Sequence, residues 1–246
     1  MAVFLGVAGA SSSALAYFEN GTNSSLVLSI YNKENNEIAI DLGRVLDTIT
    51  LQNTIVAPAG SWNIDMFPGL TLSDLNGSAR AADVTYGSVQ RYNLFFSENT
   101  TDTPVIASTR MFTPFTNANV ASFGTYSESG TSTALIESAH DNSYFWRMIG
   151  ISDLEGRFGG LVLPANEETE ADMGLLETQG YVDLFLFNYF RELSTATTIN
   201  PSTPVAVIRM MADGSVMMNP TVPLPGSLIL LSSGLLGMVG IRRKNA

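Results

Sequence analysis

Apolar and polar residues alternate over many short stretches of this chain, a pattern that predicts an all-β protein. Residues 25–32 place Leu26, Leu28 and Ile30 on one face of a strand, and residues 37–42 repeat the alternation. The polar residues between these two stretches predict a hairpin. Similar apolar stretches predict further strands within residues 49–57, 62–67, 83–96, 105–112, 144–151 and 160–163.

Two stretches close to residue 200 lead to more specific expectations. Residues 181–190 are apolar on both faces, which is typical of a central strand in a sheet that is covered on both sides. Asp183 interrupts this strand and needs a partner if it is buried. Residues 205–219 contain Asp213-Gly214 between two strand-like halves, and this dipeptide favours a two-residue hairpin turn.

The remaining part of the body predicts one short helix and one long irregular region. Asn166 is a suitable N-cap for a helix over residues 166–179, and the glutamates that follow it suit the positive end of the helix dipole. Residues 113–133 are mainly Thr, Ser, Asn, Ala and Gly, and we interpret them as a long loop or a pair of weak strands. Together the elements favour a single β-sandwich over residues 17–221, with a jelly roll as one arrangement.

The end of the chain has a different composition. Residues 226–241 carry no charge, and Arg242, Arg243 and Lys244 follow directly. As a helix this run is about 24 Å long, which is short for a bilayer but can be accommodated by local thinning and by snorkelling of the basic side chains. Cations after an apolar helix stay on the cytoplasmic side, so the body is expected on the other side of the membrane. A buried core helix is the alternative that this length allows.

Just before this helix lies the motif Val222-Pro223-Leu224-Pro225. The motif, the apolar run and the basic cluster, within residues 222–246, resemble the PEP-CTERM sorting signal of Gram-negative bacteria. Leu224 stands where the name-giving pattern has Glu, so the resemblance is to a VPLP-type variant. It implies an exosortase as partner, which processes the protein near the Pro motif. Stretches 26–31, 180–187 and 209–215 also resemble PEP-CTERM surface proteins, and that resemblance implies no catalytic residue.

Residues 1–16 predict a secretory signal peptide. An apolar run ends in Ala14-Leu15-Ala16, which fits a small-x-small cleavage site. No Lys or Arg precedes the run, so either the signal is truncated and the true start lies upstream, or the stretch is a first β-strand. Export agrees with the sorting signal at the other end.

Composition and charge exclude several functions. The absence of cysteine in 246 residues rules out thiol catalysis, thiolate metal sites and iron–sulfur clusters. The net charge is −11, and three of the 12 basic residues lie after residue 241, so the rest of the chain carries 9 basic and 23 acidic residues. Such a body does not suit nucleic acid, because binding a polyphosphate requires clustered Lys and Arg.

Few residues suggest chemistry, and we predict no catalytic residue and no enzyme. His140 is the only histidine and no Gly-x-Ser-x-Gly motif accompanies it, so a solvated loop residue is the simpler interpretation. Oxygen ligands for calcium could come from Asp141, Asn142, Asp153, Glu155 and the acidic run 167–172, without any known metal spacing. No other cofactor is predicted.

Aromatic residues could instead bind carbohydrate. Trp62, Tyr144 and Trp146, together with Tyr126, could stack on sugar rings, although a place in the core is the more common role for aromatic residues in strands.

The leading hypothesis is a non-enzymatic, exported cell-surface or extracellular-matrix protein. It is held transiently in the inner membrane, is processed by an exosortase, and acts structurally or adhesively in exopolysaccharide or biofilm. A calcium-assisted, lectin-like carbohydrate-binding module is the alternative, and an exported hydrolase is the least favoured.

Overall fold

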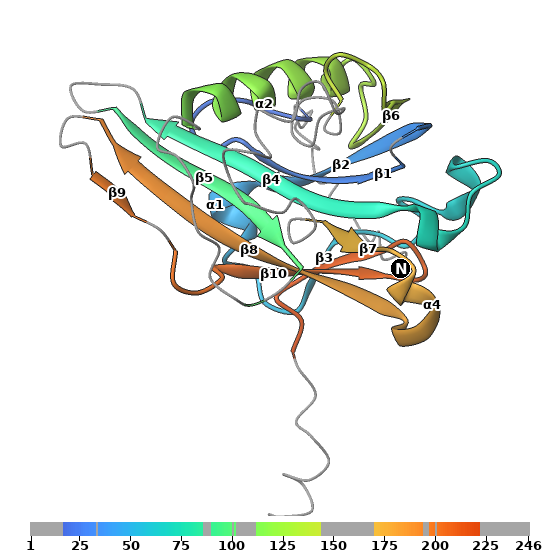
Figure 1. Ribbon diagram of the computed structural model, residues 1–246. Coiled ribbons are helices and arrows are strands. Elements are labelled where there is room, and N and C mark those ends of the chain that lie inside the picture. The colour runs from blue at the N-terminus through green and yellow to red at the C-terminus, as the bar shows by residue number, and fades with distance from the viewer. Residues whose placement is uncertain are drawn as a thin grey trace, which may run out of the picture.

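One antiparallel sheet dominates the structure (Figure 1). The computed structural model describes residues 17–32, 34–85, 90–99, 101, 112–143, 170–193, 197–199 and 201–221. Nine of its strands follow the order β3-β11-β10-β8-β5-β4-β1-β2-β6, while β7 pairs with β4 and β9 pairs with β8. The strands are β1 (Ser25–Tyr31), β2 (Asn36–Arg44), β3 (Thr54–Ala57), β4 (Asn76–Thr85), β5 (Arg91–Glu98), β6 (Thr133–Glu137), β7 (Ala171–Asp172), β8 (Tyr181–Glu192), β9 (Thr197–Ile199), β10 (Ala206–Met211) and β11 (Val216–Met218).

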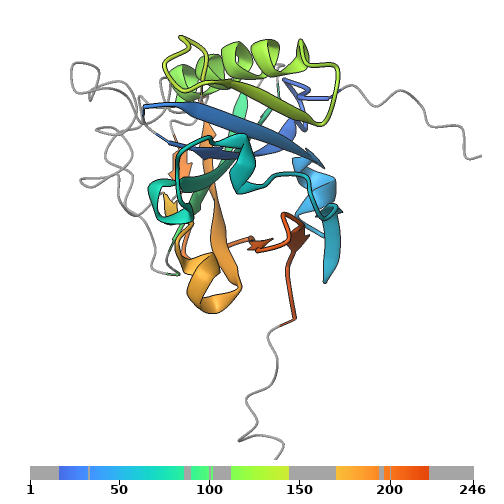
Figure 2. The same cartoon turned by 90° about the vertical axis from the view of Figure 1, so that its right-hand side faces the viewer.

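The mostly-β expectation is confirmed, but the two-layer sandwich is not. The described strands belong to a single sheet, because β8 pairs with β5 on one side and with β10 on the other. The sheet curls, so that β3, at one end of the strand order, lies against β2 near the other end (Figure 2). Curling closes the concave face over its own side chains and replaces the second layer that a sandwich would need.

The main core fills this concave face. Alternate residues of β8, Val182, Leu184 and Leu186, are buried there against the apolar face of the β1–β2 hairpin. Trp62 and Phe67, from the segment after β3, pack into the same cluster. Both hairpins expected from the sequence are present, since β1 pairs with β2 and β10 pairs with β11. Gly214 turns the second hairpin with φ +82°.

Helix α2 (Phe112–Ser127) covers part of the opposite, convex face of the sheet (Figure 1). The expectation of a loop or weak strands over residues 113–133 is therefore wrong for most of that stretch. Phe112, Phe115, Phe123 and Tyr126 recur at helical spacing and are buried against the sheet. Intrinsic helix preference is low here, so packing of this aromatic stripe supplies the stability.

Three other boundaries differ from the sequence expectations. The strand expected over residues 49–57 is limited to β3, because helix α1 (Val45–Thr48) and a turn precede it. The strand expected over 62–67 holds instead the 3₁₀ helix η1 (Ile64–Met66), and a second, η2 (Leu72–Asp74), follows.

The helix expected over 166–179 is confirmed only at its end, as α4 (Leu175–Gln179), and β7 occupies residues 171–172. Residues 105–111, 144–151, 160–163 and Asn166 lie outside the described residues.

Strand β8 is buried on both faces, as expected for a central strand. Within β8, Phe187 and Tyr189 are buried on the convex face while Leu184 and Leu186 are buried on the concave face. Asp183 accepts two hydrogen bonds from Arg209 on β10, Nε to Oδ1 at 2.7 Å and Nη2 to Oδ2 at 2.6 Å. This bidentate pair raises the pKa of Arg209, and the guanidinium also lies 3.8 Å from the Tyr181 ring centroid. Asp183 thus has the partner that its position requires.

A charged network is buried between α2 and the sheet. Arg80 on β4 and Glu37 on β2 are both 0% exposed. Arg80 donates to Asn119 Oδ1 at 2.9 Å, to Ser29 Oγ at 2.9 Å and to the Tyr126 hydroxyl at 3.0 Å, and that hydroxyl donates in turn to Glu37. A buried charge is tolerated only when it is paired and hydrogen-bonded, so this network fixes how the helix sits on the sheet.

We expect Arg80→Met to destabilise the protein by about 3 to 5 kcal/mol, because it leaves the Glu37 carboxylate buried without the cation. Urea unfolding followed by circular dichroism measures this change. Arg91→Met is the matched control, since its 2.9 Å ion pair with Glu192 leaves the Arg91 side chain 55% exposed. That control is expected to cost no more than about 1 kcal/mol. Equal losses in the two variants would contradict the role assigned to the buried network.

Two buried tyrosines make stability sensitive to alkaline pH. Burial, followed by the charge of Glu37, raises the pKa of Tyr126, and burial together with Glu98 raises the pKa of Tyr189. Both folded-state pKa values lie above the unfolded value of about 10. The stabilisation that each protonated tyrosine gives the folded state is therefore complete below the unfolded-state pKa. It is lost as the pH rises above that value.

We expect the folding constant to fall by up to about tenfold per pH unit above pH 10 for each of these two groups. Chemical unfolding at a series of pH values measures the decline, and Tyr126→Phe and Tyr189→Phe should each reduce its slope. A folding constant that stays level up to pH 11 would rule out the assignment.

Candidate functional site

The described part of the chain ends at a fixed exit point on the sheet. Strand β11 finishes at Met218, and Asn219 follows with φ +43°. Its backbone N–H donates to Val207 O at 2.7 Å, and its side-chain Oδ1 accepts from Val207 N at 2.8 Å. Through its backbone and its side chain, Asn219 therefore extends the hydrogen-bonded pairing between β11 and β10 by one residue.

The same side chain also binds a second segment. Asn219 Nδ2 donates to Ile49 O at 3.0 Å and to Leu51 O at 2.7 Å, and Asn219 O accepts from Asn53 N at 3.0 Å. These carbonyls belong to the turn between α1 and β3. Asn219 thus links β11 to β10 and to a turn far earlier in the chain. Ile49, its partner in that turn, lies 170 residues before it. We call these contacts the Asn219 clamp.

The predicted sorting residues follow directly after this clamp. Val222, Pro223, Leu224 and Pro225 begin three positions beyond Asn219, and they lie outside the described residues, as do the apolar run 226–241 and Arg242, Arg243 and Lys244. Among the helices of the described ranges, none combines the length and apolar character that crossing a bilayer requires. The expected signal peptide, residues 1–16, also lies outside the described residues.

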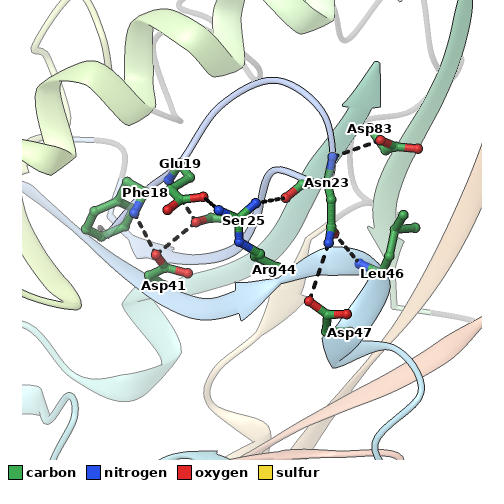
Figure 3. A network of polar contacts seen from close by, with 9 residues as sticks. All are labelled: Phe18, Glu19, Asn23, Ser25, Asp41, Arg44, Leu46, Asp47 and Asp83. Carbon is green, nitrogen blue, oxygen red and sulfur yellow. Dashed lines mark hydrogen bonds and ion pairs between the residues drawn. The ribbon is translucent and has the colours of Figure 1, made fainter. Parts of the chain in front are cut away.

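A cavity of about 430 Å³ lies between β2, β3, the segment leading into β1 and the loop after β3. Apolar residues of β2 and β3 line it together with Glu19, Asp41, Arg44 and Asp47. Figure 3 shows that each of these charged groups contacts a neighbouring residue: Glu19 and Arg44 contact one another, while Asp41 and Asp47 bind residues of the segment leading into β1. Arg44 forms an ion pair with Glu19, and Asp47 accepts from Asn23.

Asp41 is the centre of this polar network. Its Oδ2 accepts from Phe18 N at 2.6 Å and from Ser25 Oγ at 2.9 Å, and its Oδ1 accepts from Gly43 N at 2.8 Å. The carboxylate therefore holds the N-terminal segment against β2, which is a structural role. The cavity has a volume suited to a small ligand, but its charges already serve the fold.

We expect Asp41→Ala to release the segment around Phe18 and to lower the free energy of unfolding by about 2 kcal/mol, since three donors lose an ionised acceptor. Hydrogen exchange measures the local effect at the amides of Phe18 and Gly43. Asp65→Ala, at an exposed residue outside this network, serves as control. Unchanged amide protection in Asp41→Ala would contradict this role.

The residues considered for sugar stacking do not come together in the described structure. Trp62 is 2% exposed and Tyr126 is 0% exposed, so both rings belong to the core and neither presents a face to solvent. Their burial overturns the stacking interpretation for these two residues, because a stacking ring must be accessible. Tyr144 and Trp146 lie outside the described residues.

Only some of the oxygen ligands considered for calcium lie within the described residues. In the exposed turn after β6, His140 Nδ1 accepts from Asn142 N at 3.1 Å and Asn142 Nδ2 donates to Thr125 Oγ1 at 3.0 Å, while Asp141 is exposed. Asp153, Glu155 and residues 167–169 lie outside the described residues. Within the described ranges no three His, Asp or Glu side chains are grouped as metal ligands.

Sequence reasoning missed the Asn219 clamp and the Arg80 network. The Asn219-Pro220 dipeptide is a turn signal that marks the first. The second had only a weak signal, a charged residue within the otherwise apolar and small residues of 77–82.

Comparison with known proteins gives one match. Residues 221–244 match the family described as the PEP-CTERM protein-sorting motif. No curated protein and no solved structure matches the chain. The chain therefore carries a PEP-CTERM motif immediately after the Asn219 clamp, and this motif indicates an exported protein that an exosortase processes and that is anchored transiently at its C-terminus.

Proposed function

We propose that this chain is a non-enzymatic, exported surface or matrix protein whose folded body is delivered by its C-terminal signal. The observation that carries the proposal is the PEP-CTERM match over residues 221–244. In this proposal the apolar run 226–241 spans the inner membrane, with Arg242, Arg243 and Lys244 on the cytoplasmic side. Val222-Pro223-Leu224-Pro225 acts as a VPLP-type variant of the processing motif.

The role proposed for the body is structural or adhesive, within exopolysaccharide or biofilm. Three of its charged groups support this proposal, because each binds another part of the fold: Asp41 holds the N-terminal segment, Asp183 holds Arg209, and Arg80 holds α2. An excess of acidic residues, 23 against 12 basic ones, favours a soluble, self-repelling protein in a hydrated matrix.

The processing step is tested by Pro223→Ala/Pro225→Ala in the host. We expect the double variant to remain full-length in the inner membrane, because the motif is what the exosortase reads. Cell fractionation with immunoblotting against the body measures the retained and released forms. The matched control is Pro58→Ala/Pro68→Ala, since both prolines are exposed in the body. Release of both double variants at the normal rate would refute processing at this motif.

A further inference from the structure

The junction between the body and the sorting motif is unusually short. Asn219 is held by the fold and Val222 opens the motif, so only Pro220 and Thr221 separate them. In extended chain the three peptide bonds from Asn219 to Val222 span about 10 Å, and the seven peptide bonds from Asn219 to Gly226 span about 24 Å. An enzyme that reads the motif in the membrane must therefore work close beside the folded surface.

Asn219 holds a backbone conformation that is unfavourable at this position. Its φ of +43° lies in the left-handed region, and Pro220 follows it. A residue before proline prefers extended conformations, so this one persists only because surrounding contacts determine it. Those contacts are the five hydrogen bonds of the Asn219 clamp, which join it to β10 and to the turn before β3.

The consequence concerns which peptide bonds a protease can reach. Proteases bind substrates as extended chain, and residues that form sheet ladders are withheld until the structure opens locally. Strand β11 pairs with both β10 and β3, so residues up to Asn219 are withheld while the clamp is closed. Chain that is free to enter an active site begins at Pro220.

We propose that Asn219 is a positioning residue that sets the upstream limit of C-terminal processing. The inference rests on the proposed function. The processing enzyme breaks one peptide bond, passing the acyl group to water or to an acceptor amine, and the clamp confines that bond to the chain beyond Asn219. The released body then keeps β11 and ends at or after Pro220.

Asn219→Gly is the variant that isolates the clamp. Glycine accepts a positive φ without strain, so the substitution removes the three side-chain hydrogen bonds but leaves the backbone path available. Asn23→Gly is the matched control. Asn23 also has a positive φ, +51°, and its Oδ1 accepts from Leu46 N at 2.8 Å, far along the chain from the exit.

The first experiment needs no exosortase. Full-length protein in detergent is digested briefly with proteinase K, and mass spectrometry locates the cuts. Within the stretch from residue 206 to the C-terminus, we expect the unmodified protein and Asn23→Gly to be cut beyond Asn219 only, and Asn219→Gly to be cut within 206–219 at least tenfold faster. Equal cutting of β11 in all three proteins would overturn the inference, whether or not the motif is processed in cells.

The second experiment measures the product made in the host. Intact mass should give one C-terminus for the unmodified protein and for Asn23→Gly, at or after Pro220. Asn219→Gly should add shorter ends between Val216 and Asn219, a readout that general destabilisation in Asn23→Gly does not produce. The same single end in Asn219→Gly would overturn the inference. Failure of the proposed function appears differently, as normal release of Pro223→Ala/Pro225→Ala.

Discussion

Strand β8 pairs with β5 through eight residue pairs from Arg91 to Glu98 and with β10 through six from Ala206 to Met211. Because both of its edges are used, the strands before and after it join into one continuous sheet. Its twelve residues are long enough for twist to curl that sheet. Curling brings β3 against β2 and creates a concave core, while the convex face is left to be covered by α2.

The two faces are stabilised in different ways. The concave face is an apolar cluster in which side chains from both halves of the sheet interlock. The convex face combines the aromatic stripe of α2 with the buried Arg80, Glu37 and Tyr126. Apolar packing tolerates sliding of a helix, whereas hydrogen bonds to a buried guanidinium do not, so the polar network gives α2 one position.

The family match begins where the described part of the chain ends. The family match begins at residue 221, and the Asn219 clamp closes the structure two residues earlier. A firm end to the body next to a processed segment has a physical advantage, because cleavage can remove the tail without removing any strand from the sheet. The same clamp joins β11 to the turn before β3, so the exit is supported by segments from both ends of the chain.

Local patterns were sufficient for the features that depend on neighbours in sequence. Alternation with a polar loop predicted the β1–β2 hairpin, Asp213-Gly214 predicted the turn between β10 and β11, and apolar residues on both faces predicted a central β8. The sorting motif could also be recognised from the sequence, since its chemistry is carried by adjacent residues.

Tertiary structure decided the remainder. Helix α2 has weak intrinsic preference and forms because its four aromatic residues meet the convex face, which local sequence does not contain. The choice of one curled sheet over two layers depended on which strands pair across long separations. Arg80 and Asn219 acquire their roles from partners 46 and 170 residues away, and long-range pairing of this kind is determined by the assembled fold rather than by any local pattern.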